Sequence, residues 1–115
     1  MAAETEIVAG LPIACRLLSA KRQAREAELQ QEVFGAIQET HELADGYALR
    51  FPSEARWLVT LADFIRFERE CCPFLRFELH AEQQLGSFWL RLRGPAGAKE
   101  FIAELIGPPA PSSAG

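Results

Sequence analysis

Two adjacent cysteines follow a glutamate by one helical turn in the segment Glu68-Arg-Glu-Cys71-Cys72-Pro73. Residues three and four positions apart share one face of a helix, so the Glu68 carboxyl is predicted to lie beside both thiols. Two or three sulfurs with one carboxylate suit Zn(II), and sulfurs alone suit Cu(I), Hg(II) or As(III). The spacing therefore indicates a binding site for a soft, thiophilic metal or metalloid.

The position of these thiols at a helix C-terminus argues against catalysis. The negative end of the helix dipole and the nearby Glu68 carboxylate are both expected to disfavour a thiolate, which makes a poor nucleophile. A soft metal reverses that balance, because its own charge deprotonates the thiols. The sequence also shows no Gly-rich phosphate loop, no Ser-His-Asp arrangement and no C-x-x-C pair. Binding is favoured over enzyme function.

Two other interpretations remain open. The vicinal cysteines could form a thiol redox switch, although a disulfide between neighbours needs a strained ring and a local break in the helix. Glu68 could instead be the buried counter-ion of an arginine, Arg16 or Arg22. The cysteines would then only pack, and the protein would be a plain interaction module.

The elements that must position this cluster follow from the hydrophobic pattern. Residues 54–72 are predicted to form the central helix, with Ser53 as its N-cap and Pro73 as its end. Glu68 falls inside the apolar stripe of this helix, so we expect it to be buried. The stripe is predicted from Leu58, Leu61, Ala62, Ile65 and Cys72, flanked by Trp57, Phe64 and Cys71.

The remaining segments predict one α+β domain over residues 11–106. Strands are expected at 13–18, 36–43, 47–51, 75–82 and 88–93, and further helices at 20–34 and 98–106. The order β-α-β-β-α-β-β-α is typical of a two-layer sandwich, in which helices cover one face of a mainly antiparallel sheet. Residues 1–10 and the Pro/Ser-rich residues 107–115 are expected to be flexible tails.

Two more candidate site residues come from their predicted strand positions. Cys15 lies on the presumed inner face of the first strand, so it is expected to approach Cys71 and Cys72 as a third sulfur. A three-residue hairpin loop, Ala44-Asp45-Gly46, would place His41 opposite Leu49 and could turn its imidazole inward, but a surface position is favoured for this histidine.

Charge and composition limit the partners. The 115 residues carry a net charge of −4 and no run of Lys or Arg, which argues against nucleic acid and anionic membranes. No signal peptide and no apolar run of about 18 residues is found, so a cytoplasmic protein with reduced thiols is expected. The open sheet face is predicted to carry Trp89, Arg91 and Arg93, which suits a protein partner or a homodimer, with a solvated face as the alternative.

The chain resembles a family of small bacterial proteins in three segments: Gly46-Tyr-Ala-Leu-Arg-Phe-Pro52, Glu68-Arg-Glu-Cys-Cys-Pro-Phe74 and Trp89-Leu-Arg-Leu-Arg-Gly-Pro95. The Glu-x-x-Cys-Cys-Pro-Phe motif is the most specific of them, and the resemblance covers residues 11–106. It implies an association with heavy-metal resistance and points to Glu68, Cys71, Cys72 and Cys15 as the positions shared with the family.

Overall fold

The computed structural model describes residues 19–107, which contain three helices and one four-stranded sheet. The elements are α2 (Ala20–Phe34), β1 (Glu39–Leu43), β2 (Gly46–Phe51), α3 (Arg56–Cys71), β3 (Arg76–Ala81), β4 (Phe88–Arg93) and α4 (Ala98–Ile106). All strand pairs are antiparallel, in the order β1-β2-β4-β3. The predicted α+β class is confirmed. The strand predicted at 13–18, with Cys15, lies outside the described residues.

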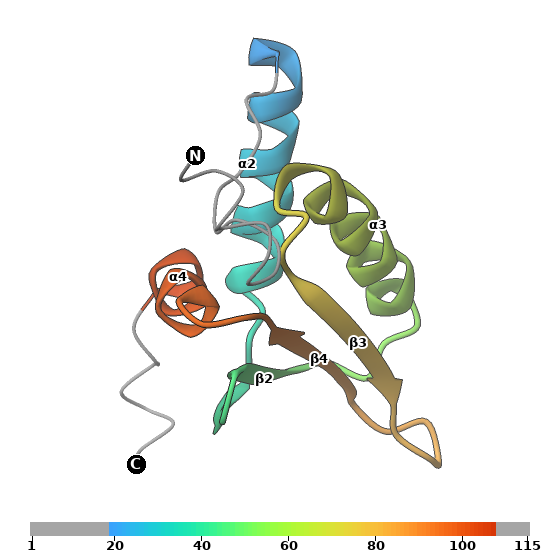
Figure 1. Cartoon of the computed structure of the whole chain (residues 1–115). Coiled ribbons are helices and arrows are strands. Elements are labelled where there is room, and N and C mark those ends of the chain that lie inside the picture. The colour runs from blue at the N-terminus through green and yellow to red at the C-terminus, as the bar shows by residue number, and fades with distance from the viewer. Residues whose placement is uncertain (1–18, 108–115) are drawn as a thin grey trace.

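The helices cover one face of the sheet (Figure 1). Along β4, the buried Phe88, Leu90 and Leu92 alternate with residues that are only half-buried. Because alternate strand residues point to opposite faces, the buried set faces the helices and the other set lies on the open face. Trp89, Arg91 and Arg93 therefore occupy the open face, as the sequence predicts.

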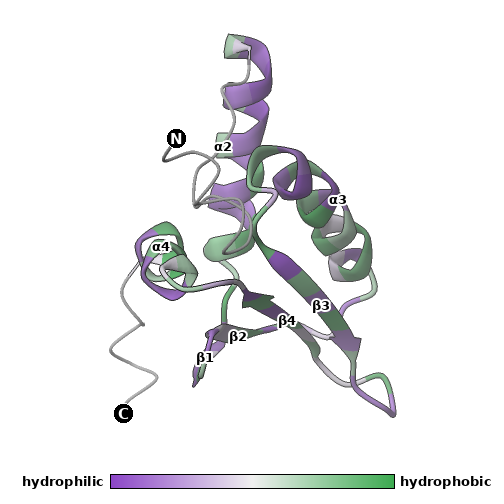
Figure 2. Ribbon diagram, viewed as in Figure 1, coloured by the Kyte–Doolittle hydropathy of each residue, from purple (hydrophilic) through white to green (hydrophobic). Residues whose placement is uncertain are grey.

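A single apolar core joins the sheet to α3 and α4 and to the C-terminal part of α2. Figure 2 shows that the N-terminal part of α2, which extends away from the sheet, is mainly hydrophilic, whereas apolar residues gather where the helices meet the sheet. Burying each large apolar side chain contributes about 1.5–3 kcal/mol. The fully buried apolar set includes Val33, Leu49, Phe51, Leu61, Phe64, Leu90, Leu92 and Ile102.

The central helix α3 differs from the prediction at its start and in its stripe. It begins at Arg56, and its N-cap residue is Ala55, which makes no side-chain cap bond, rather than Ser53. Backbone bonds from Trp57 N to Glu54 O and from Leu58 N to Ala55 O form a tight first turn instead. The predicted stripe residue Leu58 is 46% exposed, and Ala62 is also exposed.

The buried stripe of α3 is rotated toward its large aromatic residues. Trp57, Phe64 and Phe67 are buried, because aromatic side chains bury more area than leucine or alanine. Phe64 meets Phe34 of α2 edge-on, with ring centroids 5.5 Å apart. This rotation leaves Glu68 inside the stripe and brings that side of α3 against α2.

The β1–β2 hairpin has a two-residue loop, Ala44-Asp45, so the predicted three-residue loop is wrong. Leu43 pairs with Gly46, and His41 pairs with Ala48 instead of Leu49. The one-residue shift moves His41 to the open face, where its ring lies 5.1 Å from that of Trp89. The favoured surface position of His41 is thereby confirmed, and the inward position is excluded.

Gly46 explains the shifted register. It is not among the glycines with positive φ, so it does not occupy the left-handed loop position that was predicted. A Cβ atom at this position would lie 1.8 Å from the backbone oxygen of Leu92 on β4. The glycine is therefore required by the close approach of two strands rather than by the turn.

None of the helices between residues 19 and 107 is both long enough and apolar enough to cross a bilayer.

We expect Gly46→Ala to lower the free energy of unfolding by more than about 2 kcal/mol, because the added methyl collides with the Leu92 carbonyl. Gly107→Ala is the control: a Cβ there meets no atom within 4 Å, so only the positive φ of 77° costs stability, about 1 kcal/mol. Urea melts of both variants give the comparison. Equal losses of unfolding free energy in the two variants would contradict the close approach of Gly46 to the Leu92 carbonyl.

Candidate metal centre

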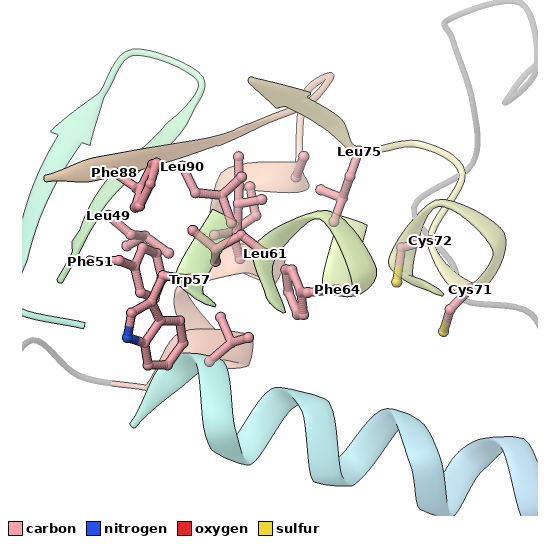
Figure 3. Packing of buried hydrophobic residues seen from close by; sticks show 14 of the residues in the cluster. Leu49, Phe51, Trp57, Leu61, Phe64, Cys71, Cys72, Leu75, Phe88 and Leu90 are labelled. Carbon is pink, nitrogen blue, oxygen red and sulfur yellow. The ribbon is translucent and has the colours of Figure 1, made fainter. Parts of the chain in front are cut away.

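Glu68, Cys71 and Cys72 lie together at the C-terminal end of α3. One ligand atom from each residue lies within 4.8 Å of the others, and the exposed fractions are 0%, 4% and 1% respectively. Figure 3 shows the sulfur atoms of Cys71 and Cys72 on the same side of the chain, pointing toward α2. The structure therefore brings these three predicted site residues together in a buried cluster.

The local backbone explains why these side chains meet. Glu68 and Cys71 belong to the last turn of α3, and Cys72 is its C-cap, whose N–H donates to the Glu68 carbonyl at 2.6 Å. Pro73 follows, and a turn closed by Leu75 N donating to Cys72 O leads the chain into β3. The helix thus ends where it can present a carboxyl and two sulfurs in one direction.

The Glu68 carboxyl is held by an amide from α2. Gln30 Nε2 donates to Glu68 Oε2 at 2.9 Å, and the same nitrogen lies 3.5 Å from Glu26 Oε2. Burial raises the pKa of Glu68 to about 8, a shift that the nearby Glu26 carboxyl reinforces and the Gln30 bond opposes. Near neutral pH this buried carboxyl is therefore mainly protonated and uncharged.

An arginine counter-ion for Glu68 is not found among residues 19–107. Arg22, one of the two predicted partners, bonds the Glu70 carboxylate instead, and its guanidinium lies 5.1 Å from the centre of the Phe67 ring. Arg16, the other predicted partner, lies outside the described residues. Glu68 is thus buried as a neutral hydrogen-bonded acid rather than as half of an ion pair with Arg22.

Cys71 is a free, buried thiol. Burial, then the Glu26 carboxyl and then Glu68, raise the pKa of Cys71 to about 12. Near neutral pH the sulfur is protonated and a weak nucleophile, as expected for a thiol beside acids at a helix C-terminus.

Cys72 is disulfide-bonded, so the expectation that the thiols are all reduced is wrong for this residue. Since Cys71 is free, the bond does not join the two neighbours. The Sγ atom of Cys72 lies 3.8 Å from Glu68 Oε1. A sulfur in a disulfide carries no proton, so this approach is a contact and not a hydrogen bond. Cys15, the predicted third sulfur, lies outside the described residues.

Sequence reasoning missed Glu26 and Gln30. Both are half-buried on α2, and they are separated by one helical turn. On α2 they lie next to the buried residues Leu29 and Val33, and this position beside the apolar stripe is the one sequence signal that could have identified them. The sequence does not show that this side of α2 faces the end of α3.

Comparison with known proteins gives no match to a family model, a curated protein or a solved structure. The function is therefore argued from the chemistry of the buried cluster.

The raised pKa of Glu68 predicts a pH-dependent stability difference. Its folded value of about 8 exceeds the unfolded value of 4.5, so the folded state binds the proton more tightly. The stabilisation that this proton gives the folded state is fully present below the unfolded-state pKa, and it is lost as the pH rises through the folded-state pKa. Relative to Glu68→Gln, the wild-type chain should lose stability progressively from about pH 5 to about pH 8.

Urea melts of wild type and Glu68→Gln at a series of pH values measure this difference. Exposed Glu104, replaced by Gln, is the control, and its stability should follow the wild-type curve. A Glu68→Gln curve parallel to the wild-type curve would contradict a neutral buried carboxyl.

Proposed function

We propose that this protein binds a soft, thiophilic metal or metalloid through Glu68, Cys71 and Cys72, with Cys15 as a further sulfur ligand. One observation carries the proposal: three ligand atoms of these residues lie within 4.8 Å of one another at one buried helix end. Donor atoms at this separation can converge on one ion with bonds of about 2.0–2.3 Å.

The electrostatics of the cluster support a bound cation rather than a catalytic thiolate. Burial holds the protons on Glu68 and Cys71, so neither group is a charged base or nucleophile near neutral pH. A metal ion supplies the positive charge that the site lacks and displaces these protons as it binds. The same burial that suppresses acid–base chemistry therefore favours a ligand that brings its own charge.

The ligand set limits the choice of ion. Two sulfurs with one carboxylate suit Zn(II), whereas three sulfurs with Cys15 would suit Cu(I), Hg(II) or As(III). A reducing cytoplasm is the compartment that would keep these sulfurs available for binding. The resemblance to proteins that accompany heavy-metal resistance agrees with such a role.

The disulfide at Cys72 favours a second candidate function, a thiol redox switch. Two reductant thiols, such as those of glutathione, would give two electrons and two protons to this bond and form their own disulfide. Cleavage would release Cys72 and its partner as thiols. The switch and the metal site are compatible, because only the reduced form offers Cys72 as a thiolate ligand.

Native mass spectrometry tests both functions. Reduced protein should gain the mass of one ion when Zn²⁺, Cd²⁺, Cu(I) or arsenite is added, and oxidised protein should not. Cys71→Ser and Cys72→Ser should each lower the affinity at least about tenfold, with the fold checked by circular dichroism. Cys15→Ser should lower it for the ions that use a third sulfur.

If reduced wild-type protein binds none of these ions, the metal-binding function is wrong. A reversible loss of two hydrogens on oxidation, without metal binding, would leave the redox switch as the function.

We also propose that the open sheet face binds a protein partner or a second copy of the chain. The rings of Trp89 and His41 lie 5.1 Å apart on this face, tilted by 52°, and Arg91 joins no ion pair within residues 19–107. An aromatic side chain beside an arginine is typical of interface residues.

Trp89→Ala should therefore weaken self-association or partner binding by about tenfold or more, because aromatic anchors carry much of an interface's affinity. Sedimentation velocity over a range of concentrations measures self-association. Leu85→Ala is the control, since Leu85 is 92% exposed but lies in the loop between β3 and β4. A chain that stays monomeric, with no interaction altered by Trp89→Ala, would show that this face is only solvated.

A further inference from the structure

We infer that Glu26 of α2 is a ligand of the metal centre, so that the site is formed between two helices and takes a divalent ion of the Zn²⁺ or Cd²⁺ type. This inference rests on the proposed metal binding. It adds a second oxygen to Glu68 and the two sulfurs, and it makes α2 one wall of the site.

The first argument is the shared amide of Gln30. Its Nε2 lies 2.9 Å from Glu68 Oε2 and 3.5 Å from Glu26 Oε2, so one nitrogen contacts both carboxyl groups. An amide nitrogen has two hydrogens and can donate to both at once. Gln30 therefore gathers two acids from different helices, which would otherwise be unfavourable neighbours.

The second argument is the contact of Glu26 with Cys71. The Glu26 carboxyl is a hydrogen-bond partner of the buried Cys71 side chain. Glu26 thus approaches both Glu68 and Cys71, which belong to the buried cluster. Two acids and a thiol that lie close together form a site that a positive ion would stabilise.

The third argument is the way α2 is fixed against α3. Arg22 bonds Glu70, and Arg25 Nη2 lies 3.2 Å from Asp63 Oδ2. Arg22, Glu26 and Gln30 follow one another at intervals of four residues, which places them on one side of α2. That side faces the last two turns of α3, so Glu26 is held toward the cluster by contacts that precede and follow it.

Exposure gives the two acids different roles. Glu68 is fully buried, whereas Glu26 is half-buried and retains access to solvent. An arriving ion would meet the Glu26 carboxylate first and then pass to the sulfurs and Glu68. Glu26 therefore lies at the entrance and Glu68 at the base of the site.

The resulting ligand set explains the preference for one class of ion. Two carboxylates and two sulfurs make four ligands, the number that Zn²⁺ adopts in tetrahedral sites. Cu(I) and As(III) favour sulfur and have little affinity for carboxylates. Loss of Glu26 should therefore weaken the binding of Zn²⁺ and Cd²⁺ and leave arsenite binding unchanged.

The experiment titrates reduced full-length chain with Zn²⁺, Cd²⁺ and arsenite in competition with a chelator or a dithiol. Glu26→Gln should weaken Zn²⁺ and Cd²⁺ binding about tenfold to a hundredfold and leave arsenite affinity unchanged. The matched control is Glu28→Gln, on the same helix, whose carboxylate is exposed and contacts only Arg25 among the described residues. It should bind all three ions like wild type.

A spectroscopic measurement distinguishes the loss of a metal ligand from an indirect effect of the substitution on folding. Co²⁺ in place of Zn²⁺ reports its ligands through its visible absorption bands, which should change in Glu26→Gln and persist in Glu28→Gln. Glu26→Asp, which keeps the carboxylate, should restore part of the affinity.

Three results would overturn the inference. Wild-type Zn²⁺ affinity in Glu26→Gln, with binding lost in Cys71→Ser, would remove Glu26 from the site and leave the proposed function intact. An equal loss for arsenite would show that Glu26 acts only through the fold. Failure of wild-type protein to bind any of the three ions would remove the proposed function and, with it, this inference.

Discussion

The burial of the Glu68 carboxyl is the constraint on which the arrangement of the helices depends. An ionised carboxylate inside a core costs several kcal/mol unless a cation or several donors stabilise it. Within residues 19–107 the structure offers it an amide, that of Gln30, and a second acid, Glu26. The carboxyl is accommodated by keeping its proton, and this requires α2 to lie where its amide reaches the end of α3.

The same constraint determines the chemistry at that helix end. Burial, reinforced by the nearby Glu26 carboxyl, raises the pKa of both Glu68 and Cys71, so these two groups hold their protons near neutral pH. A protonated carboxyl and a protonated thiol are not the ready base or nucleophile that reactions of carbonyl and phosphoryl substrates need. Metal ions and thiol reagents act differently, because they change the charge or covalent state of sulfur themselves. The proposed metal-binding and redox functions therefore share one structural origin.

Local signals made part of this structure predictable. The bounds of α2, β4 and α4 follow from a serine cap that bonds Arg22 N, from strict alternation and from flanking glycines, all of which act within a few residues. The burial of Glu68 was also predictable, because one helix's periodicity places it among apolar neighbours. These features need no knowledge of the rest of the chain.

The errors lie where distant segments meet. The hairpin register depends on Leu92, whose carbonyl occupies the space beside Gly46. The exposure of Leu58 follows from aromatic side chains that compete for the same interface. Arg22 pairs with Glu70 rather than Glu68, and Gln30 was missed, because the pattern along α2 does not reveal which helix it faces. Polar partners across an interface are specified by both surfaces together.

The attachment of α2 has a consequence for local unfolding. This helix buries only Leu29 and Val33 completely, and its remaining contacts with α3 are largely polar. It therefore has the character of a separate cooperative unit, able to open at a lower free energy than the sheet and α4. An ion bound between α2 and α3 would join two units of unequal stability, so amide exchange in α2 would slow toward the rate of the core.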